Sequence, residues 1–387
     1  MNSLPSSSER LFEVLRVFLR LGVTAFGGPA AHIAQMEREL VTRRGWLSRA
    51  EFLDLVGAAS LIPGPNSTEV AIHVGLRRAG FAGLVVAGVG FIAPAALMTT
   101  VLAWFYVRAG RAPDLFGALR AVKPVVVVIL LEAVWKLAQT ASKTKRLALI
   151  GTAAAVATVL GANPLAVLVA AGVAAAAVRT RDGSPRAGSA FGANLGPAFL
   201  AAPAAMATVP AALSLSAMFL VFLKIGSVLF GSGYVLLAFL RADLVEGAHW
   251  LTEEQLLDAV AIGQLTPGPV FTAATFLGYL LARGTGAAVA TVGIFLPAFV
   301  FVALSGPLVP RIRRSKVAGA FLDGVNVASL ALMAVVTFSL ARAAVVDRIA
   351  VGLAGVSAVL LFRLRVSSAW VIFGAAVIGF LALGVER

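Results

Sequence analysis

The sequence predicts an all-α polytopic membrane protein that consists of two inverted-topology repeats with broken helices and re-entrant Pro-Gly-Pro hairpins. Of its 387 residues, 60% are hydrophobic and 13% are charged, whereas a soluble domain carries about 25% charged residues. Apolar stretches near or above the ~20 residues needed to cross the hydrocarbon core lie at 84–107, 115–138, 213–240 and 317–340. Small residues dominate them, which favours closely packed helices over the alternating strands of a β-barrel.

The net charge of +14 is best explained by membrane orientation, because Lys and Arg collect on the cytoplasmic side. No soluble basic domain is present to bind nucleic acid. The chain has no Cys and three His, so we expect no disulfide, no metal site and no cofactor. Charged residues at positions 13, 16 and 20 interrupt the first apolar run, so we also expect no cleavable signal peptide.

An internal repeat relates the two halves of the chain. Residues 17–65 align without a gap to residues 221–269, an offset of 204 positions, and 18 of these 49 pairs are identical. After a one-residue gap the offset becomes 203. The identical pairs include Trp46-Leu47 with Trp250-Leu251, Asp54 with Asp258, and Pro63-Gly64-Pro65 with Pro267-Gly268-Pro269. Apolar composition alone would not place such motifs in register, so we infer a duplication.

Each half is expected to contain the same elements in the same order. A first helix is interrupted by a Gly-rich break, and a polar loop follows it. An apolar segment broken by Pro-Gly-Pro, two long helices and a pair of short helices complete the half. We assign the first repeat to residues 11–178 and the second repeat to residues 213–385. The Ala-, Gly- and Pro-rich segment 179–212 is predicted to be a cytoplasmic linker.

The distribution of Lys and Arg indicates that the second repeat is inverted. Segments 51–61 and 65–79 are each too short to span a membrane, so each Pro-Gly-Pro unit is treated as a hairpin that enters and leaves on one side. Each half then crosses five times, and an odd number of crossings inverts the next copy. With loop 37–50 inside, 19 Lys and Arg residues fall on the cytoplasmic face and 8 on the other. This asymmetry is the one that the positive-inside rule predicts.

Broken helices in inverted repeats are typical of secondary transporters. Irregular backbone at membrane depth must line a cavity or be buried in protein. The free N–H groups at the start of a half-helix carry partial positive charge and can bind an anion. In the first half, Asn66, Ser67 and Thr68 follow the break and can cap the half-helix or donate hydrogen bonds. The alternative is that each Gly or Pro is only a kink in a packing helix.

Several motifs resemble those of the chromate ion transporter family. They include Phe26-Gly27-Gly28-Pro29-Ala30-Ala31-His32-Ile33, Pro63-Gly64-Pro65-Asn66 and Gln264-Leu265-Thr266-Pro267-Gly268-Pro269. The resemblance covers residues 11–385 and implies a two-domain transporter that exports chromate across the inner membrane and confers resistance to it. Sulfate, which has the same shape and charge, is implied as a competing or exchanged anion. The resemblance implies a carrier and not an enzyme.

Ionisable residues within apolar segments are further candidates. Arg20 and Lys224 occupy equivalent repeat positions and could neutralise a dianion together, or their side chains could extend to the membrane interface. His32 could donate to an oxyanion or make a structural hydrogen bond. Glu69 could carry a coupling proton or form a salt bridge. Asp54 and Asp258 are expected to cap or brace the hairpins.

The predicted site combines these residues with the breaks. The expected substrate-binding residues are Arg20, Gly27, Gly28, Pro29, His32, Pro63, Gly64, Pro65, Asn66, Ser67, Thr68, Lys224, Gly231, Ser232, Gly233, Pro267, Gly268, Pro269 and Thr272. No catalytic constellation and no nucleotide-binding motif is visible, which argues against a membrane-embedded enzyme. A passive anion channel or sulfate permease remains the alternative function. The bilayer is the expected surrounding, and a homodimer is one assembly that the sequence allows.

Overall fold

The computed structural model describes residues 6–109, 113–141, 144–181, 212–230 and 233–383. This part of the chain is helical and contains no strand, which confirms the all-α prediction. Three helical segments are long and apolar enough to cross a membrane, namely Asn66–Arg108, Val270–Gly306 and Lys316–Ala344. Large apolar side chains such as Phe81, Leu97 and Phe338 are exposed, as expected of a surface that faces lipid. The chain is a polytopic membrane protein.

The two halves contain matching helices. The first half comprises α1 (Ser7–Thr24), α2 (Gly28–Glu37), the π-helix η1 (Arg38–Arg43), α3 (Arg49–Ala59), α4 (Asn66–Ala109), α5 (Pro113–Ala141), α6 (Lys145–Val159) and α7 (Pro164–Arg181). The second half comprises α9 (Leu215–Val228), η2 (Gly233–Val235), α10 (Leu236–Leu240), η3 (Arg241–Gly247), α11 (Glu253–Leu265), η4 (Val270–Thr272), α12 (Ala273–Arg314), α13 (Lys316–Ala344), α14 (Arg348–Ala358), η5 (Val359–Arg363), α15 (Ser368–Ile378) and η6 (Gly379–Leu383). Helix α7 extends three residues into the segment predicted to be a linker, most of which lies outside the described residues.

The first predicted break lies between α1 and α2. Helix α1 ends at Thr24. Gly27 and Gly28 then adopt φ values of 98° and 80°, which glycine reaches without the steric cost that other residues pay. Pro29 stands in the first turn of α2, where its missing N–H group costs nothing. The motif Gly-Gly-Pro therefore ends one helix and starts the next, and α2 and η1 run back along α1, with Gln35 bonded to Thr24 and Arg44 paired with Glu13. Both outer ends of this unit lie on one side, which contradicts the prediction that the first helix crosses the membrane and, with it, the count of five crossings in each half.

Helices α4 and α12 each fold back on themselves. In α4 the backbone leaves the helical region at Ala79 and Gly80, and in α12 it does so at the equivalent Ala282 and Arg283. The short segment 66–78 therefore packs against the long segment that follows it. A Cβ atom on Gly75 would lie 2.2 Å from the carbonyl oxygen of Gly83, so this approach requires glycine.

Each Pro-Gly-Pro motif lies between two short helices. In the first half, Glu51 at the start of α3 forms an ion pair with Arg77 at the end of the short segment of α4. The two outer ends of the unit therefore lie together, and Pro63-Gly64-Pro65 lies at its tip. In this structure the first unit is therefore a helical hairpin.

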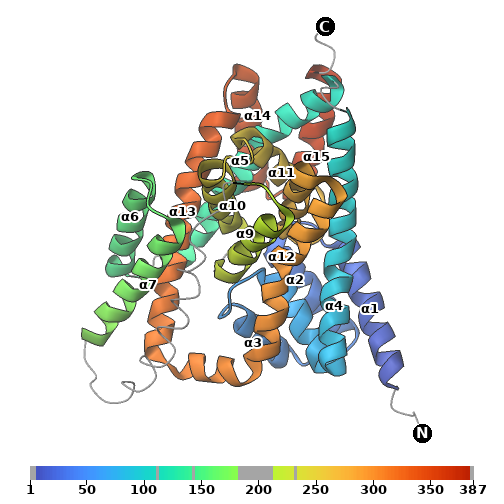
Figure 1. Cartoon of the computed structure of the whole chain (residues 1–387), viewed down its shortest axis with the longest axis vertical. Helices are drawn as coiled ribbons and strands as arrows, with labels where there is room; N and C mark the ends of the chain where they lie inside the picture. The colour runs from blue at the N-terminus through green and yellow to red at the C-terminus, as the bar shows by residue number, and fades with distance from the viewer. Residues whose placement is uncertain (1–5, 110–112, 142–143, 182–211, 231–232, 384–387) are drawn as a thin grey trace.

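The halves are intertwined. Helices α6 and α7 of the first half pack on α13 of the second half, whereas α14 and α15 of the second half pack on α5 of the first. Helices α4 and α12 contact each other, and Figure 1 shows their C-terminal ends at opposite ends of the long axis. Equivalent helices at the centre of the molecule thus run antiparallel.

Candidate functional site

Each Pro-Gly-Pro turn donates a hydrogen bond to the broken first helix of the opposite half, and together we call them the crossed turns. The N–H group of Gly64 donates to the carbonyl oxygen of Leu229 at 2.7 Å, and the N–H group of Gly268 donates to that of Ala25 at 2.7 Å. Gly64 and Gly268 are repeat equivalents, and so are Ala25 and Leu229. Each half therefore caps the broken first helix of the other half. These two bonds place the C-terminal ends of α1 and α9 against the turns that precede α4 and η4.

Glycine is required in both turns. Gly64 and Gly268 have φ values of 139° and 93°. A Cβ atom would lie 2.3 Å from Oε1 of Glu69 at position 64, and 2.7 Å from Cβ of Ala95 at position 268. The sequence suggested that these N–H groups would be free to bind an anion, and the structure corrects that expectation, because both donate to carbonyl groups.

The N-terminus of α4 retains donors. The N–H groups of Thr68 and Glu69 donate to the carbonyl oxygen of Pro65, but the first N–H groups of a helix have no partner within it. These belong to Asn66 and Ser67, directly after the turn. His32 reaches the same place from α2, with its Nδ1 atom 3.3 Å from Oγ of Ser67, and both side chains are buried. Asn66, Ser67 and His32 thus lie together, as the site prediction requires.

The first two turns of α4 carry further buried polar atoms that have no hydrogen-bond partner. Oγ1 of Thr68, both carboxyl oxygens of Glu69 and Nε2 of His73 are buried without a hydrogen-bond partner. The salt bridge considered for Glu69 does not form among the described residues. Glu69 and His73 are spaced by one helical turn on α4.

The second turn is more apolar than the first. Val270 and Phe271 follow it, and the hydroxyl group of Thr272 donates to the carbonyl oxygen of Pro269 at 2.9 Å. Thr266, just before the turn, lies 3.5 Å from Thr99 of α4. Gly231 and Ser232 lie outside the described residues. Gly233 lies beside its repeat equivalent Pro29, since a Cβ atom on it would be 3.8 Å from Cγ of Pro29.

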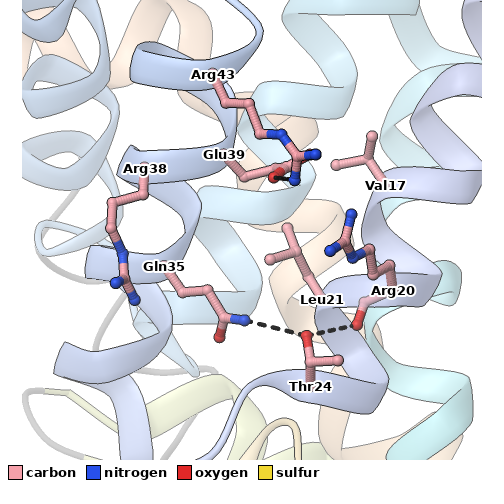
Figure 2. Close-up of a pocket in the computed structure, with 8 residues that line it drawn as sticks. All are labelled: Val17, Arg20, Leu21, Thr24, Gln35, Arg38, Glu39 and Arg43. Carbon is pink, nitrogen blue, oxygen red and sulfur yellow. Dashed lines mark hydrogen bonds and ion pairs between the residues drawn. The ribbon is translucent and has the colours of Figure 1, made fainter.

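Arg20 lines a basic pocket instead of the crossed turns. The pocket has a volume of about 420 Å³ and lies between α1 and the helices α2 and η1, as Figure 2 shows. Its walls carry three guanidinium groups and one carboxylate, and its lining consists of Val17, Arg20, Leu21, Thr24, Gln35, Arg38, Glu39 and Arg43. Within the described chain, Arg20 and Arg38 form no ion pair. The pocket therefore offers unpaired positive charge.

Hydrogen bonds and nearby cations keep the carboxylate of this pocket ionised. Burial favours the neutral form of Glu39, but a hydrogen bond from Arg44 and the charges of Arg44, Arg43 and Arg20 hold its pKa below the ordinary value. The distance from Nε of Arg44 to Oε1 of Glu39 is 2.7 Å. Glu39 thus satisfies Arg43 and Arg44 and leaves Arg20 without a direct partner.

Lys224 does not behave like Arg20, its repeat equivalent. It is 6% exposed, and its Nζ atom lies 2.7 Å from the carboxylate of Asp243. Asp243 is in turn the equivalent of Glu39. The expectation that the two cations would face one anion is therefore not met in this structure, because Lys224 already has a buried counter-ion.

Asp54 and Asp258 also differ. Asp258 lies 3.1 Å from Nζ of Lys123 and accepts a hydrogen bond from Tyr106 at 2.9 Å, so it braces α11 against α5 and α4. Lys123 also pairs with Glu254 at 2.7 Å. Asp54 occupies an exposed position on α3.

One ion pair recurs in both halves with its charges exchanged. Glu37 pairs with Arg49 at 3.2 Å in the first half. At the equivalent positions of the second half, Arg241 pairs with Glu253 at 2.6 Å. The polar loops between the broken helix and the hairpin therefore contain the same ion pair, with the acidic and the basic residue exchanged. This pair could have been found in the sequence by comparing charged positions across the repeat.

Comparisons with known proteins agree with this two-part architecture. A protein-family model described as "Chromate transporter" matches residues 12–176 and again residues 216–380. The chain is 34% identical over 377 residues to the chromate transport protein of Cupriavidus metallidurans, which covers 96% of this chain and 93% of that protein. It is 32% identical over 336 residues to the chromate transport protein of Pseudomonas aeruginosa, with 84% and 80% covered. No solved structure matches.

Proposed function

Because the chain belongs to the chromate transporter family, we propose that it is a secondary transporter that exports chromate across the inner membrane through the crossed Pro-Gly-Pro turns. The observation that carries this proposal is the reciprocal pair of hydrogen bonds from Gly64 to Leu229 and from Gly268 to Ala25. Irregular backbone at membrane depth lines a pathway or is buried in protein. Two such breaks at the junction of two repeats are the usual position of a transporter's substrate site.

The inverted arrangement of the repeats is part of the proposal. Two observations support it: the antiparallel course of α4 and α12 and the charge-exchanged pairs Glu37–Arg49 and Arg241–Glu253. The basic loop, residues 37–50, then faces the cytoplasm, and the acidic loop, residues 241–254, faces the periplasm. Reporter fusions at Arg44 and Lys316 should both be cytoplasmic, and a fusion at Glu246 should be periplasmic. Arg44 and Glu246 on one side would contradict the inversion.

Charge compensation defines the path of the anion. Chromate at neutral pH is largely a dianion, and moving it into a low-dielectric site requires positive charge. The basic pocket around Arg20 collects the anion from the cytoplasm. The N-terminus of α4 then binds it through Asn66 and Ser67, where the helix dipole contributes about half a positive charge.

Sulfate shares the tetrahedral shape and double charge of chromate, so we include it as a competing or exchanged anion. Among the described residues, no group at the turns is suited to bind chromate in preference to sulfate. Unlabelled sulfate should therefore slow chromate transport in proportion to its concentration.

Counterflow in everted vesicles tests the proposal. Vesicles preloaded with unlabelled chromate should accumulate labelled chromate transiently, because a carrier exchanges substrate across the membrane. The rate should be compared with that of vesicles made without the protein. Flux without stimulation by internal chromate would indicate a passive channel and would contradict the carrier.

A further inference from the structure

Glu69 is the acidic side chain closest to the proposed anion site. It stands in the first turn of α4 and is 0% exposed. Its Oε1 atom lies directly over Gly64, because a Cβ atom on Gly64 would be 2.3 Å from it. Both carboxyl oxygens are buried without a hydrogen-bond donor. The carboxyl group therefore touches the crossed turns and has no counter-ion.

Glu69 has no cationic partner among the described residues. Both of its carboxyl oxygens lack a hydrogen-bond donor, and no described Lys, Arg or His forms an ion pair with them. Where α12 reaches this turn, its nearest side chain is Ala298. The titratable side chains on the helices around the hairpin include His73 on α4, His32 on α2, Arg20 on α1 and Asp54 on α3, and Lys224 on α9 is paired with Asp243.

The anion and an ionised Glu69 would compete for the same positive helix end. The N-terminus of α4 favours negative charge, but it can stabilise only one negative group at a time. A dianion at Asn66 and Ser67 would repel a carboxylate one turn away. A neutral, protonated carboxyl group removes that repulsion and can be buried without a partner at far lower cost than a carboxylate.

We propose that Glu69 binds one proton each time the crossed turns bind an oxyanion, so that the transporter moves the two together. This inference rests on the proposed function and adds a coupling ion to it. The bound proton is released when the α3–α4 hairpin moves and exposes Glu69 to water. With the proton, one transported dianion carries a net charge of −1 across the membrane, and without it a net charge of −2. The second half cannot play this role, because Thr272 and Ala273 occupy the equivalent positions.

The variant Glu69→Gln is uncharged at every pH and resembles the protonated acid in shape. Its chromate–chromate counterflow, which needs no net proton movement, gives the flux against which proton movement is compared. A pH-sensitive dye inside the vesicles should show that chromate flux no longer moves protons, and the charge carried per chromate should change from one to two. The control Asp347→Asn, which keeps an N-cap side chain on α14 far from the turns, should behave like the wild type. Proton movement with chromate in Glu69→Gln would overturn the proposal.

A measurement on the unmodified protein does not depend on whether this variant folds. Chromate flux through wild-type vesicles should carry about one proton per anion, read with the same dye. Chromate transport without proton movement would refute the role of Glu69 and leave the transport function intact. Absence of chromate counterflow in the wild type would instead refute the proposed function itself.

Discussion

The region around Arg20 and the region around Lys224 occupy equivalent places in the two halves but have opposite character. In the first half, the helices enclose an open pocket with unpaired guanidinium groups. In the second half, Lys224 is buried against Asp243, and Val228, Phe239, Ala242 and Gly247 stand where the first half has Thr24, Gln35, Arg38 and Arg43. Two copies of one fold thus present an open basic face and a closed face.

The hairpins show the same difference. Helix α11 is buried over most of its length and packs against α5, α13 and α15. Helix α3 packs against α2, α4 and α12, and many of its side chains are exposed. The first hairpin is therefore more exposed than the second, although the repeat makes the two equivalent. Equivalent sequence positions are thus in different environments in the two halves.

The largest effect is expected at the turns, where the halves are alike. Gly64→Leu and Gly268→Leu should each abolish chromate transport, because both positions have positive φ and no room for a Cβ atom. Transport should be measured per inserted molecule, with Gly352→Leu on α14 as a control at a glycine that has open space around it. Normal chromate resistance in both variants would mean that the turns are only structural kinks.

Substitution of Lys224 should lower the stability of the protein more than substitution of its repeat equivalent Arg20. Lys224→Met leaves Asp243 buried without a counter-ion, which should cost about 3–5 kcal/mol. The double variant Lys224→Met/Asp243→Leu should recover most of this loss, since no unpaired charge remains. Thermal unfolding in detergent measures both. Equal stability of the single variant and the wild type would contradict the buried ion pair.

Arg20→Gln should leave stability unchanged within about 0.5 kcal/mol, because the side chain is exposed. It should nevertheless slow chromate transport about ten-fold, since hydrogen bonds to charged groups contribute about 1.5–3 kcal/mol. Arg20→Lys should retain part of the rate. Wild-type transport in Arg20→Gln would show that the basic pocket does not lie on the path of the anion.

The smallest effect concerns the charge-exchanged pairs. Exposed ion pairs contribute about 0–1 kcal/mol, so the double variant Glu37→Arg/Arg49→Glu should fold and insert with nearly unchanged stability. It places on the first loop the polarity that Arg241 and Glu253 have in the second. Single reversals should be slightly less stable than the double variant. A double variant less stable than both single variants would contradict the pairing.

The membrane class, the duplication and the positions of the breaks can all be predicted from the sequence alone. These follow from local properties: apolar segment length, Gly and Pro in register, and the distribution of Lys and Arg. It also identified the residues that meet at the turns, because Asn66, Ser67 and His32 belong to motifs adjacent to the breaks.

Which groups form hydrogen bonds and ion pairs with each other depends on the tertiary structure. The N–H groups of Gly64 and Gly268 are used by carbonyl groups of the opposite half, and this depends on how the halves cross. Lys224 is paired, whereas Arg20 is not, although the repeat gives both the same position. The pairing of a charge depends on the distance to its nearest counter-ion and on its access to water, and both are set by packing between segments far apart in the chain.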